Sequence, residues 1–196
     1  MKKKVRKLAV FVSGDGSTLQ AVIKAIALRE LDMEIKLVIS DNPKAFALIR
    51  AETAKINTKI LTSTIARIRD EEILETLNQV DIDFVLLLHY QQLIGPKVLN
   101  KYTVINSYPS LFLEYEGKGD LKIHENTVHN HTEETGVTLY FVKEVFNQNH
   151  IIWQTHVPVY IEDSVKDVLN RVSAAEKTQL VSILKALSEG KIEIPD

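Results

Sequence analysis

The chain has 196 residues, of which 45% are hydrophobic and 26% are charged, and its formal net charge is −2. This composition argues against disorder and coiled coil, and the charge lacks the broad positive excess of a nucleic-acid binder. Because the sequence contains no cysteine, it excludes disulfides, thiol catalysis, Cys-ligated zinc and iron–sulfur clusters.

The N-terminal segment is basic, and the apolar stretch 8–12 that follows it is too short for a signal peptide. The longest apolar runs, such as 84–88, are also far too short to span a membrane. We therefore expect a cytoplasmic protein with one domain, residues 1–196, and without a membrane or nucleic-acid partner. The sequence leaves open whether it is a monomer or a homodimer.

The first half of the chain alternates short apolar runs with amphipathic segments. The apolar runs predict strands over residues 8–12, 34–39, 58–61, 84–88 and 104–105. The amphipathic segments predict helices over residues 19–26, 45–55, 68–77 and 96–102. This alternation is typical of a doubly wound sheet in which most strands are parallel.

The second half has a different pattern. Residues 112–135 are mostly polar and weakly periodic, whereas 137–142 and 151–160 predict two strands that pair antiparallel at the sheet edge. Ser164 is the expected N-cap of a long final helix, and Gly190 ends that helix. The predicted fold is therefore an α/β three-layer sandwich with a mostly parallel, Rossmann-like sheet and an antiparallel edge.

The first predicted strand is followed by Ser-Gly-Asp-Gly-Ser-Thr at residues 13–18. In a strand-to-helix turn, the N–H groups of Gly16, Ser17 and Thr18 would point at an anion bound to the helix N-terminus. The turn is not a dinucleotide fingerprint, since Leu19 stands where a third glycine is needed, and no Gly-Lys-Ser/Thr follows. Two interpretations stay open: a monophosphate site, or a tight turn that Ser17 caps.

A second candidate site follows the fifth predicted strand. Ligands of open α/β sheets bind outside the carboxyl ends of the strands, which is where Asn106 and Tyr108 fall. Asn106 offers an amide donor and Tyr108 a phenol, and neither is a strong base near pH 7. The alternative is structural, with Asn106 fixing a turn before Pro109.

The remaining polar candidates look structural. Three histidines of the polar segment lack a common helical face, so we expect them to be solvated and not to bind a metal: His124, His129 and His131. Glu176 falls on the polar side of the last helix, and by this pattern alone it is a solvated residue. We expect Trp153 and Phe141 in the core.

Several short motifs occur in a fixed order, namely Ser-Gly-Asp-Gly-Ser-Thr-Leu-Gln at 13–20, Asn-Ser-Tyr-Pro-Ser-Leu at 106–111, Glu-Tyr-Glu-Gly-Lys-Gly at 114–119 and Thr-Gly-Val-Thr-Leu-Tyr at 135–140. Together with the segment 147–154, they resemble motifs of the glycinamide ribonucleotide formyltransferase family, which is folate-dependent and serves purine biosynthesis. The resemblance covers essentially the whole chain and implies the formyltransferase fold.

Enzymes of that family move a formyl group from 10-formyltetrahydrofolate to the amine of glycinamide ribonucleotide. An asparagine amide and a protonated histidine hold the oxyanion, and an aspartate orients the histidine. The resemblance gives these catalytic positions to Asn106, Tyr108 and Asn147, so only the asparagine is retained. The two replacements fit each other, because a buried aspartate without the imidazolium would be an unpaired charge.

The resemblance also implies ligand contacts. The positions for phosphate and ribose are Gly14, Gly16, Ser17, Thr18, Lys118, Gly119 and Glu176. The folate-side segment, Gly-Phe-Met-Arg-Ile/Leu-Leu in the family, reads His-Tyr-Gln-Gln-Leu-Ile at 89–94 here, and its folate contacts are Tyr90, Gln92, Leu93 and Ile94. The family's arginine is therefore absent, while the apolar pair is kept.

The resemblance thus implies a glycinamide ribonucleotide formyltransferase with impaired activity, which uses 10-formyltetrahydrofolate as co-substrate and no metal. One alternative is an inactive paralogue that binds a ribose phosphate in a regulatory or scaffold role. Another is altered chemistry on a related phosphorylated amine or another folate. The sequence leaves open whether His89 or His150 replaces the lost acid.

Overall fold

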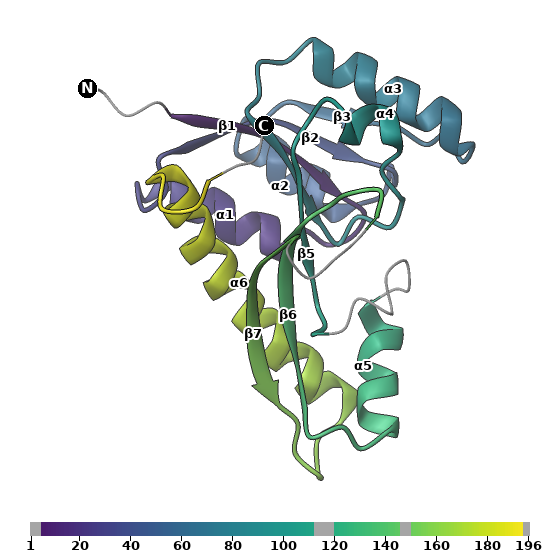
Figure 1. Ribbon diagram of the computed structural model, residues 1–196, viewed down its shortest axis with the longest axis vertical. Helices are drawn as coiled ribbons and strands as arrows, with labels where there is room; N and C mark the ends of the chain where they lie inside the picture. The colour runs from purple at the N-terminus through teal and green to yellow at the C-terminus, as the bar shows by residue number, and fades with distance from the viewer. Residues whose placement is uncertain (1–4, 112–119, 146–149, 194–196) are drawn as a thin grey trace.

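The computed structural model describes residues 5–111, 120–145 and 150–193 (Figure 1). The strands are β1 (Arg6–Val12), β2 (Met33–Ser40), β3 (Thr58–Ile60), β4 (Phe84–Leu88), β5 (Val104–Tyr108), β6 (Glu134–Phe141) and β7 (Ile151–Pro158). The helices are α1 (Ser17–Ala27), α2 (Phe46–Thr53), α3 (Ala66–Asn78), α4 (Pro96–Leu99), α5 (Asp120–His129) and α6 (Val165–Ser188).

The strands form a seven-stranded sheet in the order β3-β2-β1-β4-β5-β6-β7. Strands β1 to β5 run parallel, and β6 and β7 pair antiparallel at one edge. The predicted fold class, a mostly parallel sheet with an antiparallel edge, is therefore confirmed. The strand order reverses direction between β1 and β4, which is where open α/β sheets bind their ligands.

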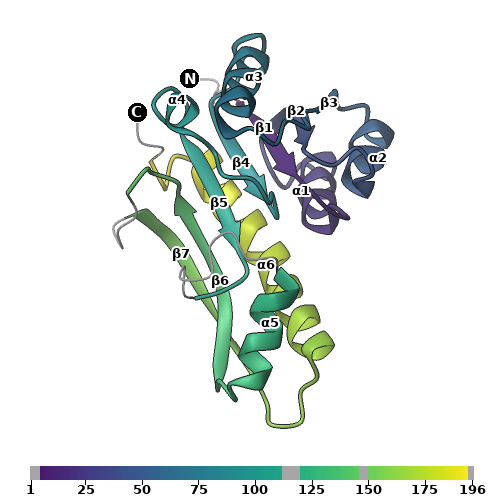
Figure 2. The same cartoon turned by 90° about the vertical axis from the view of Figure 1, so that its right-hand side faces the viewer.

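Helices cover both faces of the sheet (Figure 2). The core on one face joins β-strand residues to α1, α2 and α6, and the core on the other face joins them to α3 and α4. All five residues of β4 are buried, as expected for a central parallel strand that is covered on both sides. No helix within the described ranges is long and apolar enough to cross a membrane.

Several sequence predictions differ from the structure. The polar and weakly periodic segment, for which no element was predicted, contains α5. Its Ile123 is buried against Tyr108 and Tyr140, and the helix lies beside α6 (Figure 2). Strand β5 extends to Tyr108, so Asn106 and Tyr108 lie within the strand and not after it. The prediction that Trp153 is a core residue is wrong, because it stands on the edge strand β7 with 48% of its surface exposed.

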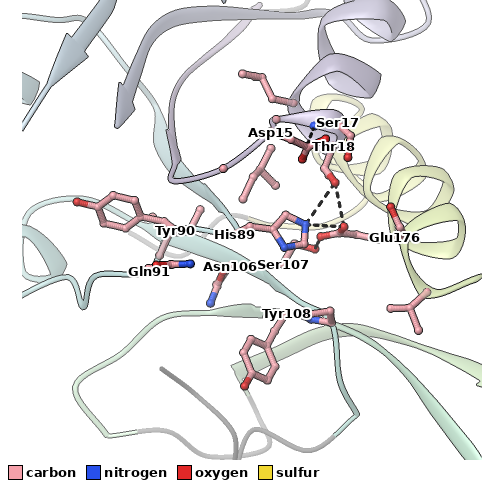
Figure 3. A pocket seen from close by; sticks show the side chains of 18 of the residues that line it. Asp15, Ser17, Thr18, His89, Tyr90, Gln91, Asn106, Ser107, Tyr108 and Glu176 are labelled. Carbon is pink, nitrogen blue, oxygen red and sulfur yellow. Dashed lines mark hydrogen bonds and ion pairs between the residues drawn. The ribbon is translucent and has the colours of Figure 1, made fainter. Parts of the chain in front are cut away.

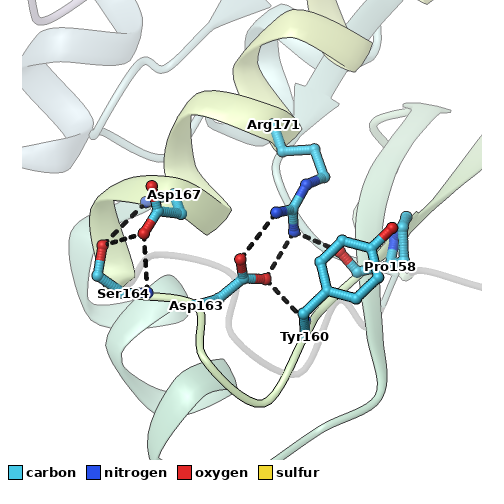
Figure 4. Close-up of polar contacts among 6 residues, drawn as sticks. All are labelled: Pro158, Tyr160, Asp163, Ser164, Asp167 and Arg171. Carbon is cyan, nitrogen blue, oxygen red and sulfur yellow. Dashed lines mark hydrogen bonds and ion pairs between the residues drawn. The ribbon is translucent and has the colours of Figure 1, made fainter.

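A capping box and an ion pair fix the first turn of α6 (Figure 4). As predicted, Ser164 is the N-cap, and it forms a capping box with Asp167. Arg171 donates to both carboxylate oxygens of Asp163, at 2.7 and 2.8 Å, and its guanidinium lies over the ring of Tyr160. The hydrogen bonds from Arg171 and from the Tyr160 backbone lower the pKa of Asp163 to about 2. The start of the helix is thus fixed at neutral pH.

Candidate functional site

A cavity of about 570 Å³ lies at the carboxyl ends of β1, β4 and β5 (Figure 3). Its walls come from the turn after β1, the segment after β4, the end of β5, and one side each of α5 and α6. The predicted site residues on these walls are Gly14, Gly16, Ser17, Thr18, Tyr90, Gln92, Leu93, Asn106, Tyr108 and Glu176. Sequence positions up to 160 residues apart are therefore brought to one chamber.

Three predicted residues, Lys118, Gly119 and Asn147, lie outside the described residues. Ile94 is described but does not line the cavity; it packs in the core on the α3 and α4 side of the sheet. His150 is likewise absent from the cavity walls.

Gly16 is the N-cap of α1 and has a left-handed backbone, with φ +72°. A Cβ at this position would also meet the Cβ of Ala47 at 2.5 Å, so both conformation and packing require glycine. Of the two interpretations of this turn, the one in which Ser17 caps the helix is wrong, because Gly16 is the N-cap and Ser17 is the first helical residue. The N-terminus of α1 is open toward the cavity, and open space surrounds the position that a Cβ of Gly14 would take.

A carboxylate lies at this same helix N-terminus. Asp15 accepts a hydrogen bond from the backbone N–H of Ser17 at 3.2 Å. An anion placed on the first N–H groups of α1 would therefore lie close to the negative charge of Asp15. The carboxylate of Asp15 therefore opposes an anion at this turn.

Glu176 of α6 is the most enclosed charged residue of the cavity, with 1% of its surface exposed. Its Oε1 accepts a hydrogen bond from the Ser107 hydroxyl at 2.6 Å, and its Oε2 accepts one from the Thr18 hydroxyl at 2.9 Å. Oε2 also lies 2.8 Å from Nε2 of His89 (Figure 3). The expectation from helix periodicity, a solvated glutamate, is wrong, because α6 turns this side toward the ends of β4 and β5.

Burial alone would raise the pKa of Glu176, but the positive charge of His89 and the three hydrogen bonds more than offset burial. The pKa of Glu176 therefore lies below its ordinary value. At neutral pH the carboxylate is therefore ionised, and it lies within ion-pair distance of His89. The cavity thus holds one acid and one base in direct contact.

Asn106 and Tyr108 lie in β5 and differ in their surroundings. The Asn106 amide donates to the hydroxyl of Tyr140 at 2.9 Å, and because its nitrogen carries two protons, one remains for a ligand. Tyr108 packs in an apolar cluster with Ile123 and Tyr140, and its ring points away from Glu176 (Figure 3). The amide faces the centre of the cavity, whereas the phenol belongs to its wall.

The segment after β4 lines another part of the cavity. Tyr90 packs edge-on against Phe11, with ring centroids 5.2 Å apart, and the Gln92 amide donates to Asp41 at 3.2 Å. Burial and the negative charge of Asp41 raise the pKa of Tyr90, so its phenol stays protonated at neutral pH. Leu93 is 70% exposed at the rim. Beyond His89, this segment offers an apolar and hydrogen-bonding surface.

One further histidine lines the cavity. His124 of α5 is only 2% exposed, so the prediction that it is solvated is wrong, whereas His129 and His131 are exposed as expected. Among the described residues, no three His, Asp or Glu side chains gather in a geometry that would hold a metal ion.

The comparison with known proteins agrees with this geometry. The sequence profile of the family described as formyl transferase matches residues 6–184. The chain belongs to the formyl transferase family. The phosphoribosylglycinamide formyltransferases of Haemophilus influenzae and Escherichia coli are 28% and 29% identical to it, over 98% and 95% of this chain and 92% and 89% of theirs.

The fold of this formyl transferase also matches solved structures of the family. The crystal structure of phosphoribosylglycinamide formyltransferase from Anaplasma phagocytophilum superposes with a TM-score of 0.85 at 29% identity, covering 98% of this chain and 92% of that one. The similarity to these relatives therefore extends over the whole fold and is not limited to one motif.

Two residues of the formyl transferase cavity were missed by sequence reasoning. Ser107 precedes Tyr108 in the motif, but only its hydrogen bond to Glu176 shows that it faces α6. Tyr140 was read as part of a strand motif, although β6 pairs with β5 and places it opposite Asn106. The antiparallel register was the missing information, because it decides which side chains are neighbours.

Replacing Glu176 by glutamine is expected to lower the free energy of unfolding by about 1–3 kcal/mol at pH 7, since the charged acceptor of three hydrogen bonds is lost. Because the folded-state pKa lies below the ordinary value, the ionised side chain stabilises the fold above that ordinary value. This contribution is lost as the pH falls through the folded-state pKa. Urea unfolding of Glu176→Gln at pH 7 and at acid pH measures the loss of stability and its pH dependence, with the exposed Glu75→Gln as the control. If Glu176→Gln and the wild-type chain have equal free energies of unfolding at pH 7, Glu176 is not the ionised acceptor of these hydrogen bonds.

Replacing Asp15 by asparagine removes the opposing charge but keeps an oxygen for the Ser17 N–H. An exposed unit charge a few ångströms from a phosphate, screened by salt, is worth roughly 0.5–1 kcal/mol in total. We therefore expect Asp15→Asn to bind ribose 5-phosphate about two- to fivefold more tightly in calorimetric titrations. The control is Asp32→Asn, which also removes one negative charge but at an exposed position before β2. Equal affinities of the two variants for ribose 5-phosphate would show that the turn does not hold the phosphate.

Proposed function

We propose that this chain transfers a formyl group from 10-formyltetrahydrofolate to the amine of glycinamide ribonucleotide, in the cytoplasm and as a step of purine biosynthesis. The observation that carries the proposal is one cavity in which an open helix N-terminus, an amide donor and an apolar segment meet. These are the three parts that a phosphorylated amine, an oxyanion and a folate require. The relatives described above are phosphoribosylglycinamide formyltransferases, and this supports the same substrates for this chain.

The helix N-terminus suits the phosphate end of the acceptor. The first N–H groups of α1 have no intrahelical partner, and the aligned peptide dipoles favour an anion there. Gly16 keeps the backbone close to α2, and Gly14 leaves the approach open. A monophosphate on this turn would have its sugar directed along the floor of the cavity, toward Glu176.

Asn106 suits the reacting end. When an amine attacks a formyl carbon, the carbonyl oxygen becomes negatively charged, and a preorganised amide donor stabilises that charge. The Tyr140 hydroxyl holds the Asn106 side chain in place through one proton of its amide. The other proton is the donor for the oxyanion.

The segment after β4 suits the folate. Tyr90 and Leu93 give flat and apolar contacts, and Gln92 is a neutral hydrogen-bonding group where the family pattern has arginine. The hydroxyl of Tyr90 is buried and has no hydrogen-bond partner in the described part of the chain, which leaves it for a ligand. We infer folate binding that relies on shape and stacking more than on charge.

Replacing Asn106 by alanine is expected to reduce the rate of formyl transfer about 10²–10³-fold, the usual effect of removing one oxyanion donor. The affinity for glycinamide ribonucleotide should change little, since Asn106 lies away from the phosphate turn. A coupled assay of folate product gives the rate, and calorimetry gives the affinity.

The control for this test is Asn100→Ala, an exposed substitution after α4. If Asn106→Ala keeps the wild-type rate, Asn106 does not stabilise the oxyanion.

A second function is favoured by one observation: Tyr108 packs among apolar side chains and cannot carry a positive charge at neutral pH. A chain without the family's histidine at this position is suited to bind a ribose phosphate without transferring a formyl group. In that case the wild-type chain would bind glycinamide ribonucleotide through the α1 turn and show no folate product. The two functions are therefore separated by the wild-type rate alone.

A further inference from the structure

We propose that His89, and not Tyr108, carries the proton during formyl transfer, and that Glu176 is the residue that positions it. The inference rests on the proposed function and deepens it, because it names the acid–base group of the same cavity.

The backbone of His89 is in the left-handed region, with φ +55°. Three other non-glycine residues of the described part share this feature, and each closely follows the end of a helix: Arg29, Lys55 and His131. A left-handed residue after a helix is an ordinary cap. His89 instead follows the strand β4 and faces the cavity, where such a conformation is strained for a residue with a Cβ. Strain of this kind collects at functional sites.

The contacts of His89 explain what holds it there. Its Nε2 lies 2.8 Å from the buried Glu176 carboxylate, while 29% of its side-chain surface remains exposed. The same carboxylate is fixed from α1 by Thr18 and from β5 by Ser107. A fixed anion behind an imidazole, with the ring reaching into a cavity, is the arrangement that orients and charges a histidine.

His89 and Asn106 occupy neighbouring positions. Strands β4 and β5 are adjacent, and Leu87 pairs with Asn106 in their register, two residues before His89. Both side chains line the same cavity, and Figure 3 shows them on the same side of Glu176. A formyl group held by the Asn106 amide would therefore lie in the same cavity as the imidazole.

The other titratable groups around His89 suit the role less well. Glu176 approaches from α6 and is bonded on both oxygens, and Asp15 approaches from the α1 turn, on the side where the acceptor phosphate would bind. Tyr108 of β5 points away into its apolar cluster. His124 of α5 is the main rival, and only 2% of its surface is exposed.

The step balances without any further reagent. The acceptor nitrogen forms a bond to the formyl carbon, and the carbonyl electron pair moves to oxygen, where Asn106 stabilises it. The bond between the formyl carbon and N10 of the folate then breaks. His89, protonated, gives the proton on Nδ1 to the leaving N10 and takes a proton from the acceptor nitrogen. The formyl group and one proton have exchanged places, and His89 ends as it began.

The test measures formyl transfer from 10-formyltetrahydrofolate to glycinamide ribonucleotide between pH 5 and 9. Glycine adopts the left-handed conformation without strain, so His89→Gly is expected to fold and to leave a cavity for a small base. We expect its kcat to fall about 10²–10⁴-fold and to recover in part when imidazole is added. His89→Gln should show the same loss without recovery. Glu176→Gln should shift the pH profile while His89 is still present.

Two other variants complete the test. His156 of β7 is exposed, and its Nδ1 lies 3.1 Å from the carboxylate of Glu134 on β6. His156→Gln therefore removes a histidine with a carboxylate partner outside the cavity, and it should keep the wild-type pH profile. His124→Gln tests the rival. The inference is overturned if His89→Gly keeps the wild-type kcat, if imidazole does not restore it, or if His124→Gln alone flattens the pH profile. A wild-type chain without turnover would instead overturn the proposed function, and this inference with it.

Discussion

The buried carboxylate of Glu176 is the interaction on which the rest of the site depends. Removing a charge from water costs several kcal/mol, and here the cost is offset by two hydroxyl donors and a histidine. The donors come from α1, from β5 and from the residue after β4, so the carboxylate of α6 fixes three separate chain segments relative to one another. The capping box and the ion pair at the start of α6 hold the helix that delivers it.

The cavity has two unlike halves because of this arrangement. On the side of α6, charged and hydroxyl groups meet around Glu176, and His89 reaches from them toward the cavity. On the side of α5, Tyr108 packs with Ile123 and Tyr140 in an apolar cluster. Acid–base chemistry is consistent with the first half and not with the second. Relative to the family pattern, we infer that the proton-carrying group has moved from β5 to the end of β4.

Much of the fold was predictable, because β1 to β5 are short apolar runs and the helices between them are amphipathic. The helix α5 was not, since its sequence is polar and only one side of it packs. That Asn106 lines the ligand cavity followed from topology, although it lies within β5 and not after it. The burial of Glu176 and the role of Ser107 did not follow from local sequence, because both depend on how α6 crosses the sheet. The conformation of His89 has no sequence signal at all.

The most direct measurement is a crystal structure of the wild-type chain with glycinamide ribonucleotide and a non-reactive 10-formyl-folate analogue. The account predicts phosphate oxygens on the N–H groups of Ser17 and Thr18, and the formyl oxygen on the Asn106 amide. It also predicts the acceptor amine within hydrogen-bond distance of Nδ1 of His89, with Nε2 still on Glu176. An amine that instead contacts Tyr108, with the His89 ring turned away from both ligands, would contradict it.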